Sequence, residues 1–138
     1  MSEENVEIVR SVYDAVQRGD AAGVFAAYDR EIEFDFTQSP IVTLMNHEVY
    51  IGHEGVKELF QERRSDAWES VADRCEDLID AGNDQVVSVV TTKGRGRVSE
   101  AEVELVHAGL WTIRNGKVSR VAWFGSREKA LEAAGLSE

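Results

Sequence analysis

The amino-acid sequence predicts one α+β domain, with most of its helices in the N-terminal half and an antiparallel sheet in the C-terminal half. Two observations predict this class. Apolar residues recur at helical spacing in much of the first 68 residues, and side chains from Glu69 onward alternate between apolar and polar. Helices followed by strands are typical of α+β proteins. The sequence has neither an internal repeat nor a linker, so we expect residues 1–138 to form one domain.

The N-terminal segment predicts two helices. Val9, Tyr13 and Val16 recur at the spacing of one helical face. Gly19 suits the left-handed conformation that ends a helix, and Asp20 can cap a second, shorter helix. The second helix is expected to offer these side chains to the interior: Val24, Phe25, Ala27 and Tyr28.

Residues 31–36 form the first predicted strand, because charged and apolar side chains alternate there and two of them are phenylalanines. Residues 37–51 contain the only proline, Pro40, and show no clear period, so we expect an irregular rim or lid over a site. Gly52 begins a turn into an amphipathic helix that is expected to end near Trp68.

Three or four strands are predicted after Glu69, at about residues 71–79, 85–96, 103–113 and 117–124. Tight turns are expected at residues 81–84 and at Asn115–Gly116, the residue pair preferred in type I′ turns. Ser126 can cap a closing helix over residues 127–134.

Composition limits the classes of partner. The chain has 138 residues and a formal net charge of −11, with 43% hydrophobic and 30% charged residues. The acidic balance argues against nucleic acid and anionic membranes, because phosphate binding needs clustered Lys and Arg. Cys75 is alone, so an internal disulfide is excluded, and we find no signal peptide or membrane-spanning run. We therefore expect a cytoplasmic protein.

The common cofactor and metal motifs are missing from the sequence. It contains no glycine-rich phosphate loop, no Gly-x-Ser-x-Gly turn and no His-Glu-x-x-His pair. His47, His53 and His107 lack the spacing of a local metal site. We therefore expect neither a metal nor another cofactor.

Asp35 is the first candidate catalytic residue, because it lies between Phe34 and Phe36. A carboxylate lowered into an apolar pocket has a raised pKa and can act as a general base. Strand alternation puts Glu33 and Asp35 on one face and the two phenylalanines on the other. Two alternatives stay open: Asp35 faces the pocket, or the phenylalanines face it and Asp35 is a solvated strand residue.

His107 is the second candidate catalytic residue, in phase with Leu105 and Trp111 on a predicted strand. It is either a half-buried histidine bonded to a neighbour, or a donor to a ligand carbonyl or partner of Asp35. Aromatic residues are expected mainly in the core, although some can line a cavity and orient a ligand. The candidates for ligand contact are Tyr13, Tyr28, Phe34, Trp68, Trp111 and Trp123.

Five segments, in order along nearly the whole chain, resemble the SnoaL-like branch of the nuclear transport factor 2-like superfamily. They are Val12–Asp20, Glu31–Phe36, Tyr50–Val56, Trp111–Val118 and Ser126–Leu136. The resemblance implies a cone, in which a strongly curved antiparallel sheet wraps around three helices and leaves a deep pocket. Function stays open, because the superfamily includes polyketide cyclases, ketosteroid isomerases, dehydratases, epoxide hydrolases and non-catalytic modules.

The resemblance implies Asp35 as a general base, because alignment at Gly19–Asp20 places it on the base of the ketosteroid isomerases. The oxyanion-hole tyrosine of those enzymes falls at Val12, and their second aspartate falls near Ala108. The oxyanion donors are therefore missing, which excludes an isomerase of the standard design. Residues 121–124 also lack the late-strand carboxylate of the polyketide cyclases.

Two functional classes follow. One is a cofactor-independent isomerase, cyclase or dehydratase that moves a proton on a small apolar or polycyclic ketone-like substrate, with Asp35 as base. The other is a non-catalytic module that binds a small apolar molecule or dimerises. We also expect a homodimer through the exposed face of the sheet, where Val106, Ala108 and Leu110 would place apolar side chains in water. The family resemblance implies the same assembly.

Overall fold

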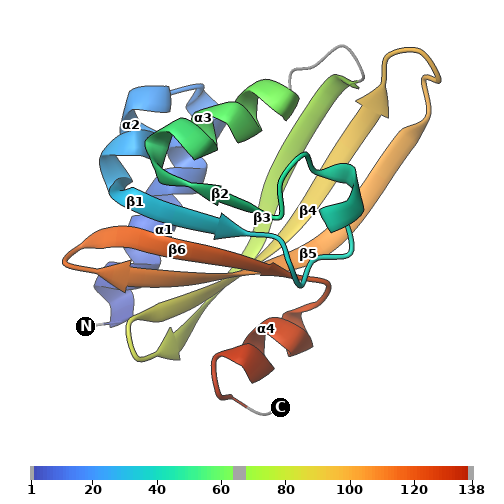
Figure 1. Ribbon diagram of the computed structural model, residues 1–138. Coiled ribbons are helices and arrows are strands. Elements are labelled where there is room, and N and C mark those ends of the chain that lie inside the picture. Colours follow the sequence, from blue (N-terminus) through green and yellow to red (C-terminus); the bar gives the residue numbers. More distant parts are fainter. Residues whose placement is uncertain (1, 64–67, 137–138) are drawn as a thin grey trace.

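The computed structural model describes residues 2–63 and 68–136 and has the predicted α+β architecture (Figure 1). Within these residues the chain forms four α-helices, one short 3-10 helix and six strands. In chain order they are α1 (Ser2–Arg18), α2 (Ala21–Ala27), β1 (Tyr28–Asp35), η1 (Val42–Leu44), β2 (Val49–Ile51), α3 (Gly52–Arg63), β3 (Trp68–Gly82), β4 (Gln85–Gly96), β5 (Glu102–Arg114), β6 (Lys117–Phe124) and α4 (Arg127–Ala133).

The six strands form one curved sheet in the order β2-β1-β6-β5-β4-β3 (Figure 1). Neighbouring strands are antiparallel except β1 and β6, which run parallel. The sheet is therefore mixed, whereas the sequence predicts a purely antiparallel one. The tight turns in the sequence predict the antiparallel pairing of consecutive strands from β3 to β6. By contrast, β1 and β6 pair although more than eighty residues separate them in the chain. Local pattern carries no information about such a pairing.

The three N-terminal helices pack against one face of the sheet, which we call the inner face (Figure 1). Val9 of α1, Val24 of α2 and Val56 of α3 are at most 2% exposed. They belong to one apolar cluster with inner-face residues such as Ile32 and Trp111. Because full burial of an aliphatic side chain contributes about 1.5–3 kcal/mol, this cluster supplies much of the stability of the cone.

Turn and capping residues end the elements where the sequence predicts. Gly19 has a φ of +70°, and its amide bonds to the Val16 carbonyl while the Asp20 amide bonds to the Ala15 carbonyl. This pair of bonds is the Schellman motif, in which a glycine takes the left-handed position after a helix. Ser126 accepts a hydrogen bond from the Lys129 amide and caps α4.

Three segments differ from the sequence-based expectation. Residues 37–51, expected to be irregular, contain η1 and the short strand β2, which pairs with β1. Three residues are too few for an alternation pattern to show. Tyr28 begins β1 instead of ending α2. Helix α3 is described as far as Arg63, the remainder of its expected span lies outside the described residues, and Trp68 is the first residue of β3.

The outer face of the sheet is covered in part by α4. Ala130 and Leu131 of this helix form a second apolar cluster with Ala108 and Leu110 of β5, which are 0% and 5% exposed. Ala108 and Leu110 are therefore buried within the chain, whereas Val106 on the same strand face is 55% exposed. The homodimer remains a prediction, with less apolar outer surface to support it than the sequence suggests.

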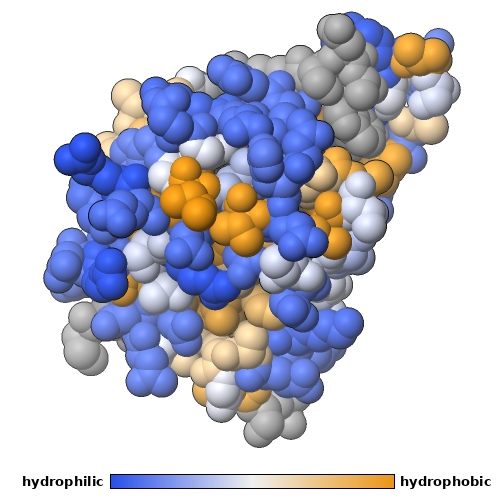
Figure 2. Space-filling view, in the orientation of Figure 1, coloured by the Kyte–Doolittle hydropathy of each residue, from blue (hydrophilic) through white to orange (hydrophobic). Residues whose placement is uncertain are grey.

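The face of the molecule seen in Figure 2 is mostly hydrophilic and carries small, separate apolar patches. Scattered apolar groups of this kind are normal on a protein surface. Across the described part of the chain, none of the helices combines the length and the hydrophobicity that crossing a membrane requires.

Ser88 is a fully buried polar residue on the inner face of β4. Its Oγ accepts hydrogen bonds from Trp111 Nε1, at 2.9 Å, and from the Tyr13 hydroxyl, at 3.0 Å. One small hydroxyl thus satisfies two aromatic donors, one on α1 and one on β5, and joins the helical layer to the sheet.

Ser88→Ala is expected to lower the free energy of unfolding by about 2–4 kcal/mol, because two interior donors lose their acceptor at once. Urea denaturation followed by circular dichroism would measure the loss. Ser11→Ala is the matched control, since Ser11 is exposed on α1 and its hydroxyl bonds to the Ile8 carbonyl. An equal effect of the two substitutions would contradict the importance of the Ser88 contacts.

Candidate functional site

A chain of four polar side chains crosses from α3 into the inner face of the sheet. Arg63, in the last turn of α3, donates to both carboxylate oxygens of Asp73 on β3, at 2.8 and 3.0 Å. The hydroxyl of Thr92 on β4 donates to Asp73 Oδ1 at 2.6 Å. The same hydroxyl oxygen lies 2.9 Å from Nε2 of His107 on β5. The chain thus ends at a histidine that is 6% exposed.

The hydrogen-bond roles in this chain set the tautomer of His107. An ionised carboxylate only accepts hydrogen bonds, so the single hydroxyl proton of Thr92 points to Asp73. The hydroxyl oxygen must then accept from His107, whose Nε2 carries the proton. In the neutral ring Nδ1 therefore keeps its lone pair, and it is buried without a hydrogen-bond partner among the described residues.

Electrostatics keep Asp73 ionised and His107 neutral. Burial acts to raise the pKa of Asp73, but the charge of Arg63 and the hydrogen bonds from Arg63 and Thr92 outweigh it and leave the pKa below its usual value. Burial lowers the pKa of His107, although the charge of Asp73 acts in the opposite direction. The imidazole is therefore neutral at pH 7 and its Nδ1 is an acceptor.

His107 ends a row of aromatic rings. It stacks on Trp123, with ring centroids 4.8 Å apart and planes 25° apart. Trp123 in turn stacks on Phe36, at 6.2 Å and 10°. Trp123 is 8% exposed, and its Nε1 is also buried without a partner in the described part of the chain. The interior thus holds one acceptor and one donor on adjacent stacked rings.

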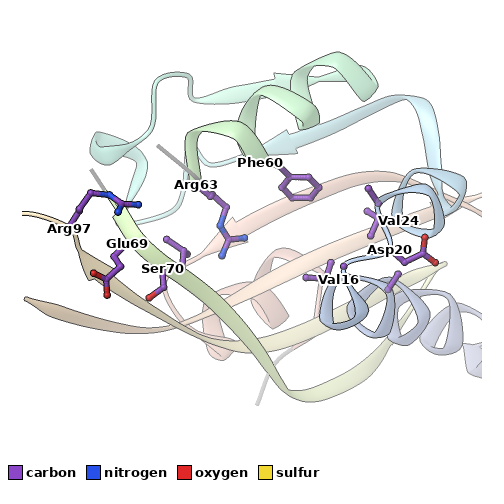
Figure 3. A pocket seen from close by; sticks show the side chains of 12 residues that line it. Val16, Asp20, Val24, Phe60, Arg63, Glu69, Ser70 and Arg97 are labelled. Atoms are coloured by element: carbon purple, nitrogen blue, oxygen red, sulfur yellow. The ribbon is translucent and has the colours of Figure 1, made fainter. Parts of the chain in front are cut away.

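A pocket of about 420 Å³ lies between the α1–α2 break, the last turn of α3 and the first residues of β3. Figure 3 shows Phe60 and Arg63 reaching into it from α3, with Val16 and Val24 at one end and Arg97 at the other. The lining combines apolar and charged side chains. The residues are Ala15, Val16, Gly19, Asp20, Ala21, Val24, Phe60, Arg63, Glu69, Ser70, Val71 and Arg97.

Asp35 lies on the face of β1 opposite to the phenylalanines. Phe34 and Phe36 are 5% exposed and belong to the inner cluster. The carboxylate of Asp35 accepts hydrogen bonds from Arg120 on β6 and from the amide and hydroxyl of Thr37. Burial acts to raise its pKa, but these bonds and the charge of Arg120 outweigh it and leave the pKa below its usual value. The phenylalanines thus face the interior, as in the second alternative, but Asp35 is ion-paired and 14% exposed rather than solvated. These contacts provide no support for Asp35 as a base.

Of the other predicted ligand contacts, four are packed in the core and the side chain of the fifth is not described. Tyr13 and Trp111 donate to Ser88 and pack edge to face at 5.5 Å. Tyr28 and Phe34 are buried and contact each other in the inner cluster. The side chain of Trp68 lies outside the described part of the structure. Trp123 is thus the predicted aromatic contact whose polar atom is buried and unpaired in the described structure.

One surface group brings three side chains that could ligate a metal close together near β2 and α3. Single ligand atoms of His47, Glu58 and Glu62 lie within 4.8 Å of one another. His47 Nε2 and Glu58 already lie 2.7 Å apart, and Glu62 accepts from the Tyr50 hydroxyl at 2.7 Å. These hydrogen bonds account for the proximity of the three side chains without a cation.

His107 and Trp123 are candidates from the sequence, whereas Arg63, Asp73 and Thr92 are not. These three lie among many similar polar residues, and no local motif distinguishes them. Their meeting depends on the register of β3, β4 and β5. Because a one-residue shift would turn each side chain to the opposite face, sequence alone could not identify the chain.

The model of the SnoaL-like domain family matches residues 9–121 of the chain. A search of the curated proteins gave no match. Solved structures with a similar fold include TerC co-crystallised with polyporic acid, at 18% identity and a TM-score of 0.75, covering 96% of this chain and 98% of TerC. An NTF2-like protein of unknown function from Burkholderia pseudomallei has 18% identity and a TM-score of 0.75, with 96% of each chain covered.

A third similar structure is RV0760c from Mycobacterium tuberculosis in complex with estradiol-17beta-hemisuccinate. It has 15% identity and a TM-score of 0.70, covering 90% of this chain and 95% of RV0760c. At these identities the likeness establishes the fold, which agrees with the cone seen here, and says nothing of a shared activity.

Asp73→Asn is expected to lower the free energy of unfolding at pH 7 by about 1–3 kcal/mol, because Arg63 and Thr92 lose a charged acceptor in a partly exposed setting. The unfolded chain protonates Asp73 near its ordinary pKa of about 3.9, whereas the folded protein holds the carboxylate to lower pH. The wild type therefore loses this stabilisation as the pH falls below about 4, and the variant has little of it to lose.

Urea denaturation at pH 7 and at pH 3 would measure both effects. Asp14→Asn, at an exposed position on α1, is the matched control and should behave as the wild type. Equal losses of stability on acidification in Asp73→Asn and the wild type would show that Asp73 is not a stabilising carboxylate.

Proposed function

This chain belongs to the SnoaL-like domain family, and on that basis we propose that it binds a small, mostly apolar molecule within the cone. The ligand occupies the pocket between the α1–α2 break, the last turn of α3 and the first residues of β3. The pocket's size and lining carry the proposal: about 420 Å³ falls within the range of small-molecule sites, roughly 300–1,000 Å³.

The lining also matches the usual composition of such sites, in which apolar walls carry a few polar groups that orient the ligand. Val16, Val24 and Phe60 supply apolar surface, while Arg63 and Arg97 supply positive groups. Two structures of similar fold support the same class of ligand, since one was co-crystallised with polyporic acid and the other is a complex with estradiol-17beta-hemisuccinate.

Cofactor-independent proton transfer on a ketone-like substrate is a second candidate function, and one observation favours it. His107 is a neutral imidazole with an unshared lone pair on Nδ1, in an interior where burial strengthens polar interactions. Asp35 is a weaker candidate for the base, because its carboxylate is held by Arg120 and Thr37 on the outer face. The alternative of a purely binding module requires no base at all.

Val16→Phe is expected to weaken ligand binding by at least about tenfold, because the larger ring fills part of the pocket. Isothermal titration calorimetry with estradiol-17beta-hemisuccinate and with polyporic acid would measure the affinity. Val103→Phe is the matched control: Val103 is 50% exposed on β5 against 40% for Val16, and it lies away from the pocket. If either probe binds the wild type and Val16→Phe with equal affinity, the pocket is not the binding site. Failure of the wild type to bind either probe would count against the proposed function for this class of ligand.

A further inference from the structure

We propose that His47, Glu58 and Glu62 form a binding site for one divalent transition-metal ion, with Zn²⁺ as the ion that the ligand set fits best. The three residues lie near β2 and α3, and none of them lines the pocket of the proposed function. The inference is therefore independent of that function. The sequence-based expectation of no metal rested on the spacing of the histidines, whereas this site takes one histidine and two carboxylates.

The first support is the convergence of three ligands from two parts of the chain. Glu58 and Glu62 are four residues apart on α3, so both carboxylates project from one face of the helix. His47 precedes β2, which packs beside α3 (Figure 1). One ligand atom from each residue lies within 4.8 Å of the other two. Tetrahedral zinc ligands lie roughly 3.3 Å apart, so small side-chain rotations would complete the site.

The second support is a buried carboxylate oxygen without a partner. Hydrogen bonds account for the proximity of the three side chains, but the bond that Glu62 accepts from Tyr50 uses Oε1. Glu62 Oε2 is buried and has no hydrogen-bond partner in the described part of the chain. A buried acceptor without a partner is costly, and acidic side chains four residues apart on a helix repel each other. A cation bound between Glu58 and Glu62 would offset both costs.

The third support is a buried tyrosine that positions two of the ligands. The Tyr50 hydroxyl donates to Glu62 Oε1 at 2.7 Å and accepts from the His47 amide at 3.3 Å. Its ring packs edge to face against the His47 ring, with centroids 5.3 Å apart. Tyr50 is 2% exposed, so its hydroxyl has a fixed position. Metal ligands in proteins are commonly held by hydrogen bonds of this kind, which fix their orientation.

The surroundings give a hydrated cation access to the site. The side chains of His47 and Glu58 are 52% and 49% exposed and line a pocket of about 560 Å³. Lys57 also lines this pocket, but its ammonium lies 3.5 Å from Glu54. The net charge of −11 further favours a cation.

The chemistry of the ligand atoms selects the ion. An imidazole nitrogen suits transition metals such as Zn²⁺, whereas Mg²⁺ and Ca²⁺ prefer oxygen ligands alone. Three protein ligands leave a fourth tetrahedral position for water, as in zinc sites that are open to solvent. The set of one histidine and two glutamates therefore favours Zn²⁺ over the lighter cations.

Isothermal titration calorimetry with zinc chloride tests the site. The wild type is expected to bind one Zn²⁺ per chain, with a Kd of about 1 μM or tighter. Glu62→Gln keeps an acceptor for the Tyr50 hydroxyl but loses the anionic ligand, and should weaken binding by at least about tenfold. Tyr50→Phe keeps the ring and all three ligands, and should weaken binding by about 10–100-fold because two ligands lose the hydroxyl that positions them.

Glu54→Gln is the matched control. Glu54 lies on the same helix and lines the same pocket, but its side chain is 91% exposed and it is not one of the three ligands. This variant should bind Zn²⁺ as the wild type does. Equal weakening in Glu54→Gln and Glu62→Gln, or displacement of Zn²⁺ by an excess of Mg²⁺, would show only diffuse attraction by surface carboxylates and overturn the inference.

Nitrogen NMR of the wild-type histidines covers the case of a variant that fails to fold. Zn²⁺ should shift the Nε2 resonance of His47 and leave those of His53 and His107 in place. An unchanged His47 resonance would overturn the inference. Val16→Phe, which is expected to lose ligand binding, should bind Zn²⁺ with wild-type affinity. Failure of the metal site and failure of the ligand pocket therefore give different results.

Discussion

The ion pair between Arg63 and Asp73 is the interaction on which the interior of the cone depends. It joins the end of α3 to β3, with side chains that are 29% and 19% exposed. Charges in such a setting lose hydration, and only a two-pronged contact with good geometry offsets that loss. Arg63 and Asp73 make such a contact. The Asp73 carboxylate also accepts a hydrogen bond from the Thr92 hydroxyl, which in turn orients His107. A charge pair near the surface thereby determines the tautomer of a histidine in the core.

The aromatic side chains on the inner face of the sheet differ in whether their polar atoms are hydrogen-bonded. Tyr13 and Trp111 both donate to Ser88, a residue with no exposed surface, and their polar atoms are therefore structural. Trp123 and His107 lie on the same face but keep unpaired nitrogens. Because burial makes an unpaired group costly, the Ser88 contacts stabilise the interior, whereas the two unpaired nitrogens lower its stability.

Asp35 shows how the packing of a strand decides the surroundings of a candidate catalytic residue. The strand exists, and the alternation of its side chains is as expected. The core selects Phe34 and Phe36 for the inner face, since burying two phenylalanines is far more favourable than burying a carboxylate. The Asp35 carboxylate therefore lies on the outer face, where hydrogen bonds from Arg120 and Thr37 stabilise its ionised form. The inner face instead buries a histidine, His107 of β5, among its polar residues.

Sequence alone determined the α+β class, the extent of β4 and β6, the helix end at Gly19 and the cap at Ser126. These features depend on periodicity and on the conformations of neighbouring residues, which are local properties. The parallel pairing of β1 with β6, the covering of Ala108 and Leu110 by α4, and the meeting of Arg63, Asp73, Thr92 and His107 were decided only in three dimensions. Each requires the relative register of segments far apart in the chain, and register is set by how the whole core packs rather than by any one segment.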